Sequence, residues 1–202
     1  MVRMEIDAAA FEAWECEPCT IGFELVKLRD LIGLAEPGDL IEMNYDENDG
    51  RVNIQVGEIN RTIRPLDRAT MLEPRVPDVE LHSSVKLSAV KFSRALRAAK
   101  QVGDLATISL NAQSFGVNVS GDTDTVNVSY DAGELEDLVC DGPVKSQYSL
   151  SLLYPMAKRM EAIVDSVTLF FNENHPLRLE FEFADGAGRC VYFLAPRIEG
   201  DA

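Results

Sequence analysis

Basic residues are scarce in this sequence. Its 202 residues include 19 Lys and Arg against 34 Asp and Glu, so the formal net charge is −15. A chain this acidic does not hold nucleic acid through its overall electrostatic field, because phosphates carry charge of the same sign. Any contact with DNA must therefore be local.

Long apolar runs and targeting signals are also missing. No apolar stretch approaches the length that crosses a bilayer, and the start MVRMEIDAAAFEAWE lacks a basic region followed by an apolar one. We therefore expect a cytoplasmic protein with no targeting segment. Its length suffices for one large or two small packed domains.

Cysteines are few, and we interpret the four as reduced thiols because a disulfide scaffold needs more. Cys16 and Cys19 have the C-x-x-C spacing of metal and redox motifs. A structural zinc site needs a second ligand pair, however, and Cys140 and Cys190 stand alone. A thioredoxin-type motif would open a helix, whereas Cys19 leads into a predicted strand. Structural thiols are the favoured interpretation, and we expect no metal and no cofactor.

Catalytic motifs are absent as well. The sequence contains no G-x-G-x-x-G, no phosphate-binding P-loop and no G-x-S-x-G. The run from Asp46 to Gly50 resembles the start of a calcium loop, but Gly57 stands where the closing Glu should fall, so a hairpin turn is favoured. His82 and His175 have no evident catalytic partner. We therefore expect a protein that is not an enzyme.

Strict alternation of apolar and polar residues is the dominant local pattern. It runs through 51–56 and 177–183 and recurs around 117–119 and 126–130, as is typical of antiparallel strands with one buried face. Only three segments have helical spacing, at about 25–35, 88–102 and 150–163. The sequence therefore predicts an α+β fold.

The predicted elements repeat. The order strand, helix, strand, strand, strand occurs at about 20–66, 79–131 and 144–196, and residues 1–7 form one more strand. If such units pair into domains, this chain holds three of an expected four. Residues 67–80 break every periodicity and contain two prolines, so we predict a first domain at 1–66, a connector at 67–80 and a second domain at 81–202.

The predicted helices carry a local excess of positive charge. Residues 85–100 hold five basic residues and no acid, and the helix within them has an apolar face opposite a cationic one. Without interleaved aromatics, such a face suits phosphate contact and does not read bases. The alternative is an ordinary solvated helix face. The candidate DNA-facing residues are Lys91, Arg94, Arg97, Lys100, Lys158, Arg159, Lys27 and Arg29.

A small apolar surface is predicted near the C-terminus. The last strand ends in Ala195-Pro196, and together with Pro176 and connector residues it could form a groove for the apolar anchors of a partner. An ordinary last strand is the alternative. The candidate groove residues are Met71, Leu72, Val76, Pro176, Phe193, Ala195, Pro196 and Ile198.

Four stretches resemble one family: MVRMEIDAAAFEAW, FSRALRAAKQVGD, SVTLFFNENHPLRLEFEFADG and the terminal YFLAPRIE. The sequence resembles DNA sliding clamps of the archaeal and eukaryotic type, the proliferating cell nuclear antigen family. The resemblance implies a two-domain clamp fold with antiparallel sheets outside and helices lining the inner face of a homotrimeric ring around duplex DNA. It also implies a nucleoid-associated replication and repair protein.

The resemblance assigns roles to particular residues. Arg94, Arg97 and Lys158 match inner-wall residues of the family, and the other basic residues lie on matching helices. The groove residues match positions that receive a short motif of polymerases, ligases and nucleases, with Phe193 replacing a tyrosine common in some members. The family also implies a clamp loader as partner. Its subunit contacts imply pairing between strands at about 59–66 and 124–131.

The resemblance also implies a difference at the N-terminus. Family members have a strand-helix unit before the position that matches Met1, so the first domain is expected to be incomplete, with uncovered apolar strand faces. A misassigned start codon, a deliberate truncation and a shortened paralogue all remain open. The expected function is a DNA polymerase processivity clamp. The alternative is a shortened adaptor that binds partner motifs without encircling DNA.

Overall fold

The computed structural model describes residues 1–67, 69, 71 and 75–198. The chain forms two compact units: a larger unit of Met1–Trp14 with Val76–Ala202, and a smaller unit of Glu15–Arg75. This division differs from the predicted domains 1–66 and 81–202 at the N-terminus. Residues 1–14 associate with the larger unit because the first strand pairs with the last one.

The smaller unit is a helix packed on a three-stranded antiparallel sheet. It contains α1 (Leu25–Ile32), β2 (Ile41–Asp46), β3 (Arg51–Val56) and β4 (Ile59–Ile63), in the sheet order β2-β3-β4. Alternation in β3 buries Val52, Ile54 and Val56 in a small core with Leu31 of α1. The predicted strand before α1 is reduced to a single bridge between Gly22 and Leu66.

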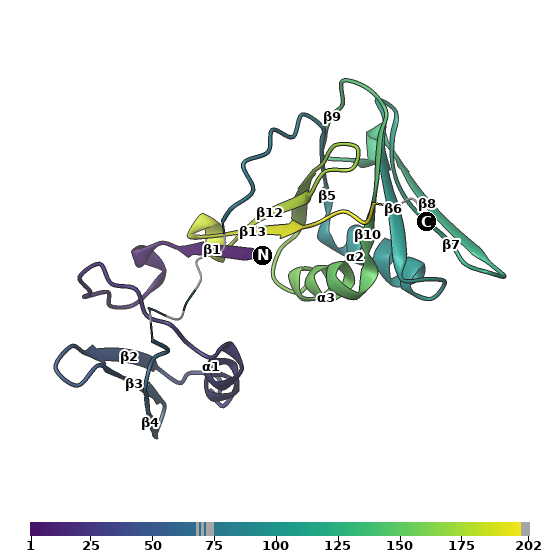
Figure 1. Cartoon of the computed structure of the whole chain (residues 1–202). Coiled ribbons are helices and arrows are strands. Elements are labelled where there is room, and N and C mark those ends of the chain that lie inside the picture. The colour runs from purple at the N-terminus through teal and green to yellow at the C-terminus, as the bar shows by residue number, and fades with distance from the viewer. Residues whose placement is uncertain (68, 70, 72–74, 199–202) are drawn as a thin grey trace. The chain divides into compact units, whose positions relative to one another are not determined.

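The larger unit contains two antiparallel sheets and two helices (Figure 1). The six-stranded sheet has the order β1 (Val2–Ile6), β13 (Gly188–Leu194), β12 (Leu177–Phe183), β11 (Ser166–Phe170), β5 (Ser84–Ser88) and β9 (Asp137–Val139). The four-stranded sheet has the order β10 (Val144–Ser149), β6 (Leu105–Leu110), β7 (Ser114–Ser120) and β8 (Thr125–Asp131). The helices are α2 (Ala89–Lys100) and α3 (Leu150–Met160).

One core joins both sheets and both helices of the larger unit. The apolar face of α2 buries Phe92, Leu96 and Ala99 completely, and α3 buries Leu153 beside them. Ser88 caps α2, because its hydroxyl oxygen accepts a hydrogen bond from the backbone N–H of Lys91. The two helices contact each other. Their buried faces are fixed by packing, so their polar faces point away from the sheets.

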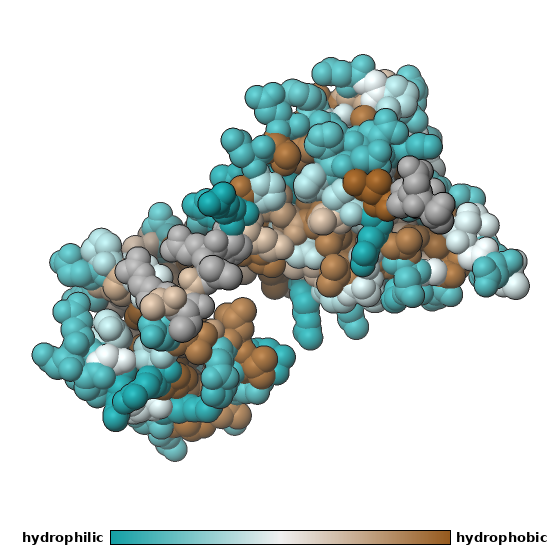
Figure 2. All heavy atoms as spheres, in the orientation of Figure 1, coloured by the Kyte–Doolittle hydropathy of each residue, from teal (hydrophilic) through white to brown (hydrophobic). Residues whose placement is uncertain are grey.

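Several apolar strand faces are uncovered, as the resemblance implied. The side chains of Val2, Met4 and Ile6 on β1 are each about half exposed, and Met43 of β2 is 48% exposed. Residues that pair across neighbouring strands share one face of the sheet. Met4 pairs with the buried Cys190 and Met43 with the buried Ile54, so these exposed side chains lie on the apolar faces of their sheets. Figure 2 shows further hydrophobic side chains over α1 on the visible face of the smaller unit.

The α+β fold predicted from the sequence is confirmed, with each helix two or three residues shorter than its predicted segment at the C-terminal end. Within the described part of the chain, none of the helices combines the length and the apolar character that a membrane span requires.

Candidate nucleic-acid and partner interfaces

Four basic side chains form what we call the basic helix surface: Arg94 and Arg97 on α2, and Lys158 and Arg159 on α3. All four are exposed, and the two helices that carry them pack against each other. Among the described residues, none of the four has a carboxylate oxygen within 4.0 Å. Their charges are therefore free to contact an anion.

The other four candidate basic residues are already paired with acids. Lys91 lies 3.6 Å from a carboxylate oxygen of Glu134, and Lys100 pairs with Asp104 one helical turn on. In the smaller unit, the ammonium of Lys27 is 2.6 Å from Glu24, and the guanidinium of Arg29 is 2.6 Å from Asp30. Exposed pairs of this kind are weak, so they reduce the attraction of these residues for a phosphate without removing it.

The first turn of α2 is held in place by Tyr130 of β8. The Tyr130 hydroxyl donates a 2.9 Å hydrogen bond to the backbone carbonyl of Lys91, and its ring stacks on Phe115 with a centroid distance of 6.5 Å. Burial raises the pKa of Tyr130, and the nearby Arg94 opposes that shift. The contact ties the arginine-bearing helix to the edge strand β8.

The groove residues of the larger unit gather where β12 begins and β13 ends. Pro176 immediately precedes β12, Phe193 lies in β13, and Ala195 follows it on the same face of the strand. Phe193 is only 8% exposed, yet it lies outside the main core. Its side chain is nearly buried on the face of β13 opposite the main core.

One side-chain and one backbone hydrogen bond hold the two ends of this surface. The buried Tyr148 of β10 donates from its hydroxyl to the carbonyl of His175 over 2.8 Å, which fixes the turn before Pro176. The backbone N–H of Arg197 donates to the carbonyl of Gln147 over 2.7 Å. Beside this contact, Ile198 lines a cavity of about 320 Å³ with Lys145, Gln147, Glu173 and Arg197, among others.

The connector residues are divided between the two units. Val76 belongs to the larger unit and is 46% exposed, whereas Met71 belongs to the smaller unit, where its sulfur packs against Gly22. Leu72 lies outside the described residues. Of the eight candidate groove residues, five lie at or beside the start of β12 and the end of β13: Pro176, Phe193, Ala195, Pro196 and Ile198.

Sequence reasoning missed Arg178, which lies beside Phe193 in the sheet register. Its guanidinium sits over the ring of Phe170 at 4.1 Å from the centroid, and its Nε is 3.0 Å from a carboxylate oxygen of Glu180. Alternation along β12 could have revealed this position. Arg178 lies on the same face of the strand as Pro176, opposite the face that buries Leu177 and Leu179. Arg178 thus lies beside Phe193 as one member of an ion pair with Glu180.

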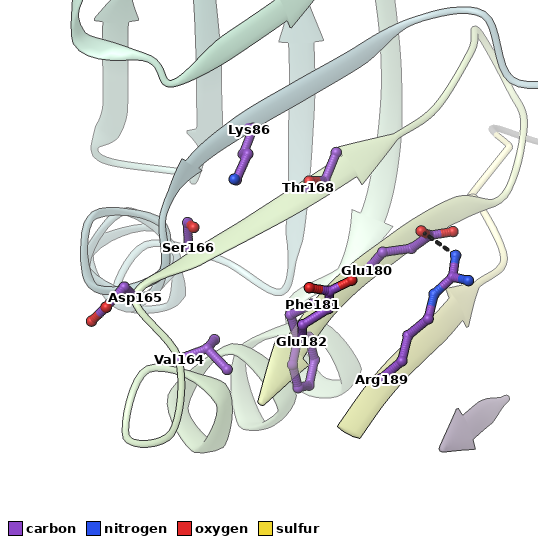
Figure 3. A pocket seen from close by; sticks show the side chains of 9 residues that line it. All are labelled: Lys86, Val164, Asp165, Ser166, Thr168, Glu180, Phe181, Glu182 and Arg189. Atoms are coloured by element: carbon purple, nitrogen blue, oxygen red, sulfur yellow. Dashed lines mark hydrogen bonds and ion pairs between the residues drawn. The ribbon is translucent and has the colours of Figure 1, made fainter. Parts of the chain in front are cut away.

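A separate hollow of about 600 Å³ lies over β5, β11, β12 and β13 (Figure 3). Glu180 accepts a 2.9 Å hydrogen bond from Arg189 there, and Lys86 and Thr168 line the opposite side. Lys86, one of the five basic residues at 85–100, therefore lies away from the helices, on the other face of the sheet. Across the described residues, no group of three His, Cys, Asp or Glu side chains is placed to hold a metal ion.

Comparison with known proteins gives a consistent result. The family model for the proliferating cell nuclear antigen C-terminal domain matches residues 75–197. A DNA polymerase sliding clamp of Methanosarcina mazei is 37% identical over 98% of this chain and 80% of its own length. A DNA polymerase sliding clamp of Natronomonas pharaonis is 34% identical over all of this chain and 82% of its own.

The fold comparison agrees. The chain resembles A. fulgidus PCNA bound to the C-terminal region of FEN-1, with a TM-score of 0.89 and 26% identity. The match covers 99% of this chain and 81% of that one.

Proposed function

Because the chain belongs to the proliferating cell nuclear antigen family of DNA polymerase sliding clamps, we propose that it acts as a homotrimeric ring that encircles duplex DNA and tethers replication and repair proteins to it. The role is one of binding, not catalysis. Encirclement retains the clamp topologically, while weak phosphate contacts allow it to slide.

The basic helix surface is the observation that carries this proposal. In a chain of net charge −15, its four unpaired cations lie together on helices that turn their polar faces away from the sheets. Arg and Lys without aromatic neighbours contact phosphates and leave bases unread. An acidic protein with one cationic face repels DNA elsewhere, which favours binding through that face alone.

Ring closure is supported by the internal repeat. In the larger unit, β1 pairs antiparallel with β13, the last strand of the third repeat. The repeats pair into two domains, and each domain has one strand at the end of its first repeat and one at the end of its second. β1 and β8 end the first repeats of their domains, so they correspond to each other. β4 and β13 end the second repeats and also correspond. Both β4 and β8 are edge strands. We therefore infer that β4 of one copy pairs with β8 of the next, in a head-to-tail contact that closes a ring.

Partners are proposed to bind at the groove floored by Phe193. The related A. fulgidus PCNA holds the C-terminal region of the nuclease FEN-1, and we propose that this chain takes similar short peptides from polymerases, ligases and nucleases. A clamp loader is the further partner that ring opening requires. The adaptor alternative shares this groove and differs only in not encircling DNA.

Charge reversal separates the two candidates. The variant Arg94→Glu with Arg97→Glu should lose most clamp-stimulated synthesis on a primed circular template, assayed with a clamp-dependent DNA polymerase and its loader. Binding of a FEN-1 C-terminal peptide should stay unchanged, because the groove lies elsewhere. The matched control, Lys86→Glu with Arg189→Glu, alters charge equally on the opposite face of the sheet and should retain synthesis. Undiminished synthesis in the helix variant would refute the DNA-facing assignment.

A further inference from the structure

Cys16 and Cys19 lie side by side on the surface of the smaller unit. Their Sγ atoms are 3.8 Å apart, at hydrogen-bonding distance for sulfur, and both side chains are exposed. Cys190, in contrast, is fully buried in the core of the larger unit. Cysteines that serve packing are usually among the most buried residues. The interpretation of this pair as structural thiols therefore does not fit its exposure.

We propose that Cys16 and Cys19 form a reversible intrachain disulfide by exchange with a small-molecule disulfide of the glutathione type. A disulfide bond is about 2.05 Å long, so the two sulfurs must approach by less than about 2 Å. Rotation of two exposed side chains supplies that movement without displacing any core residue. Among the described residues, the Sγ of Cys16 makes one other hydrogen bond, a 3.1 Å bond that it donates to the carbonyl of Glu17.

The chemistry proceeds in two exchange steps. A thiolate of the pair attacks one sulfur of the small disulfide, forms a mixed disulfide and releases one small thiolate, which takes up a proton. The neighbouring cysteine then attacks the protein sulfur of the mixed disulfide, and the second small thiol leaves. Two electrons pass from the cysteine pair to the small disulfide, which becomes two thiols. The same steps in reverse reduce the pair.

The surroundings set the pH range of the reaction. The hydrogen bond with Cys19 raises the pKa of Cys16, and the carboxylates of Glu17 and of Glu47 in the β2–β3 turn add to the effect. Since the thiolate is the attacking species, a raised pKa leaves little of it at neutral pH. Exchange should therefore speed up as the pH rises toward the pKa of the thiol.

The disulfide would act on a defined part of the chain. Residues 16–19 directly follow Trp14 and Glu15, where the chain passes from the larger unit to the smaller one. Closing a ring across these residues restricts their backbone. Oxidation would thus stiffen the segment that leads from β1 toward α1.

Mass spectrometry tests the proposal directly. Cleavage after Arg3 and Lys27 places both cysteines on one peptide, residues 4–27. After the folded, reduced protein is treated with oxidised glutathione, this peptide should lose two hydrogen atoms and carry no glutathione. The variants Cys16→Ser and Cys19→Ser should each retain one glutathione on the remaining cysteine, because the second attacking thiol is gone.

The control variant Cys140→Ser should give the same oxidised peptide as the wild type. Three results would overturn the proposal. Glutathione could remain on the wild-type peptide, or the peptides 4–27 of two chains could be joined to each other by a disulfide. In the third result, the peptide from the folded protein stays reduced although the urea-unfolded chain reacts. None of these readouts depends on DNA or on a partner, so the result stands apart from the proposed clamp function.

Discussion

Tyr148 is buried beneath the groove, and its ionisation links stability to pH. Burial raises its pKa to about 12 from an ordinary value near 10. Below pH 10 the Tyr148 hydroxyl is protonated in both the folded and the unfolded chain. Between pH 10 and 12 the unfolded chain loses this proton while the folded chain keeps it, so the free energy of unfolding falls, by about 2 to 3 kcal/mol at the upper end.

The variant Tyr148→Phe isolates this effect. At pH 8 it should be less stable than the wild type by about 1 kcal/mol, because the carbonyl of His175 loses its hydrogen bond. As the pH rises from 10 to 12 the difference should shrink or reverse, since phenylalanine cannot ionise. Urea denaturation at several pH values measures it. A difference that stays constant across that range would contradict the assignment.

Phe193 is expected to supply the main apolar contact for a partner peptide. Phe193→Ala should weaken binding of a FEN-1 C-terminal peptide by about 10- to 100-fold, as loss of an aromatic anchor usually does. Isothermal titration calorimetry gives the affinity. Phe193→Tyr should bind normally, because it restores the residue that the family resemblance implied at this position.

A matched control guards against a general loss of structure in Phe193→Ala. Val191 lies two residues earlier on the same face of β13, so Val191→Ala also truncates a side chain on that face. It should leave peptide affinity unchanged. Equal weakening by Val191→Ala and Phe193→Ala would show that the strand and not the anchor was affected.

At the scale of elements, the free edges of β4 and β8 carry opposite charges. Arg61 lies in β4 and Arg64 just after it, whereas Asp124 precedes β8 and Asp131 ends it. If these edges pair between copies, light scattering should give the mass of three subunits for the wild type. Arg61→Glu should shift the mass toward the monomer at low protein concentration, since it places a negative charge on β4 when the proposed partner strand already carries acids at its ends.

The control for this edge variant is Arg51→Glu, which makes the same charge change on the central strand β3. It should keep the three-subunit mass. The proposed pairing would be contradicted if light scattering gave the mass of a monomer for the wild type. It would also be contradicted if Arg61→Glu kept the three-subunit mass at the same protein concentrations as Arg51→Glu.

Local pattern was enough to predict most elements of this fold. Alternation in β3 and β12 and the apolar stripe of α2 reflect packing on one face, which the sequence records directly. The ends of the helices were less certain, because fraying and capping involve few residues. The strand expected before α1 was wrong in extent, since a single bridge from Gly22 to Leu66 replaces it.

Tertiary contacts were beyond what the sequence could predict. The positive charge of α2 was visible, but the pairing of Lys91 with Glu134 arises only through the fold. The grouping of residues 1–14 with the larger unit depends on the pairing of β1 with β13, the two ends of the chain. Arg178 was overlooked because a lone arginine in an alternating strand normally faces solvent.

At the scale of the whole molecule, the proposed clamp combines a net charge of −15, the basic helix surface and the edge strands β4 and β8. The net charge of −15 disfavours DNA contact outside the basic helix surface. In the proposed ring, the edge strands β4 and β8, which would otherwise promote aggregation, would pair in subunit contacts. Retention on DNA then depends on topology and tolerates weak phosphate contacts, which is what sliding requires.

Encirclement itself is the central claim, and DNA topology tests it most directly. The chain is loaded by a clamp loader onto nicked circular DNA and passed through gel filtration at high salt, before and after a restriction enzyme linearises the DNA. The account predicts that the protein stays with circular DNA and is lost from linear DNA, because only a ring can slide off an open end. Equal retention on both forms, or none on either, would contradict it.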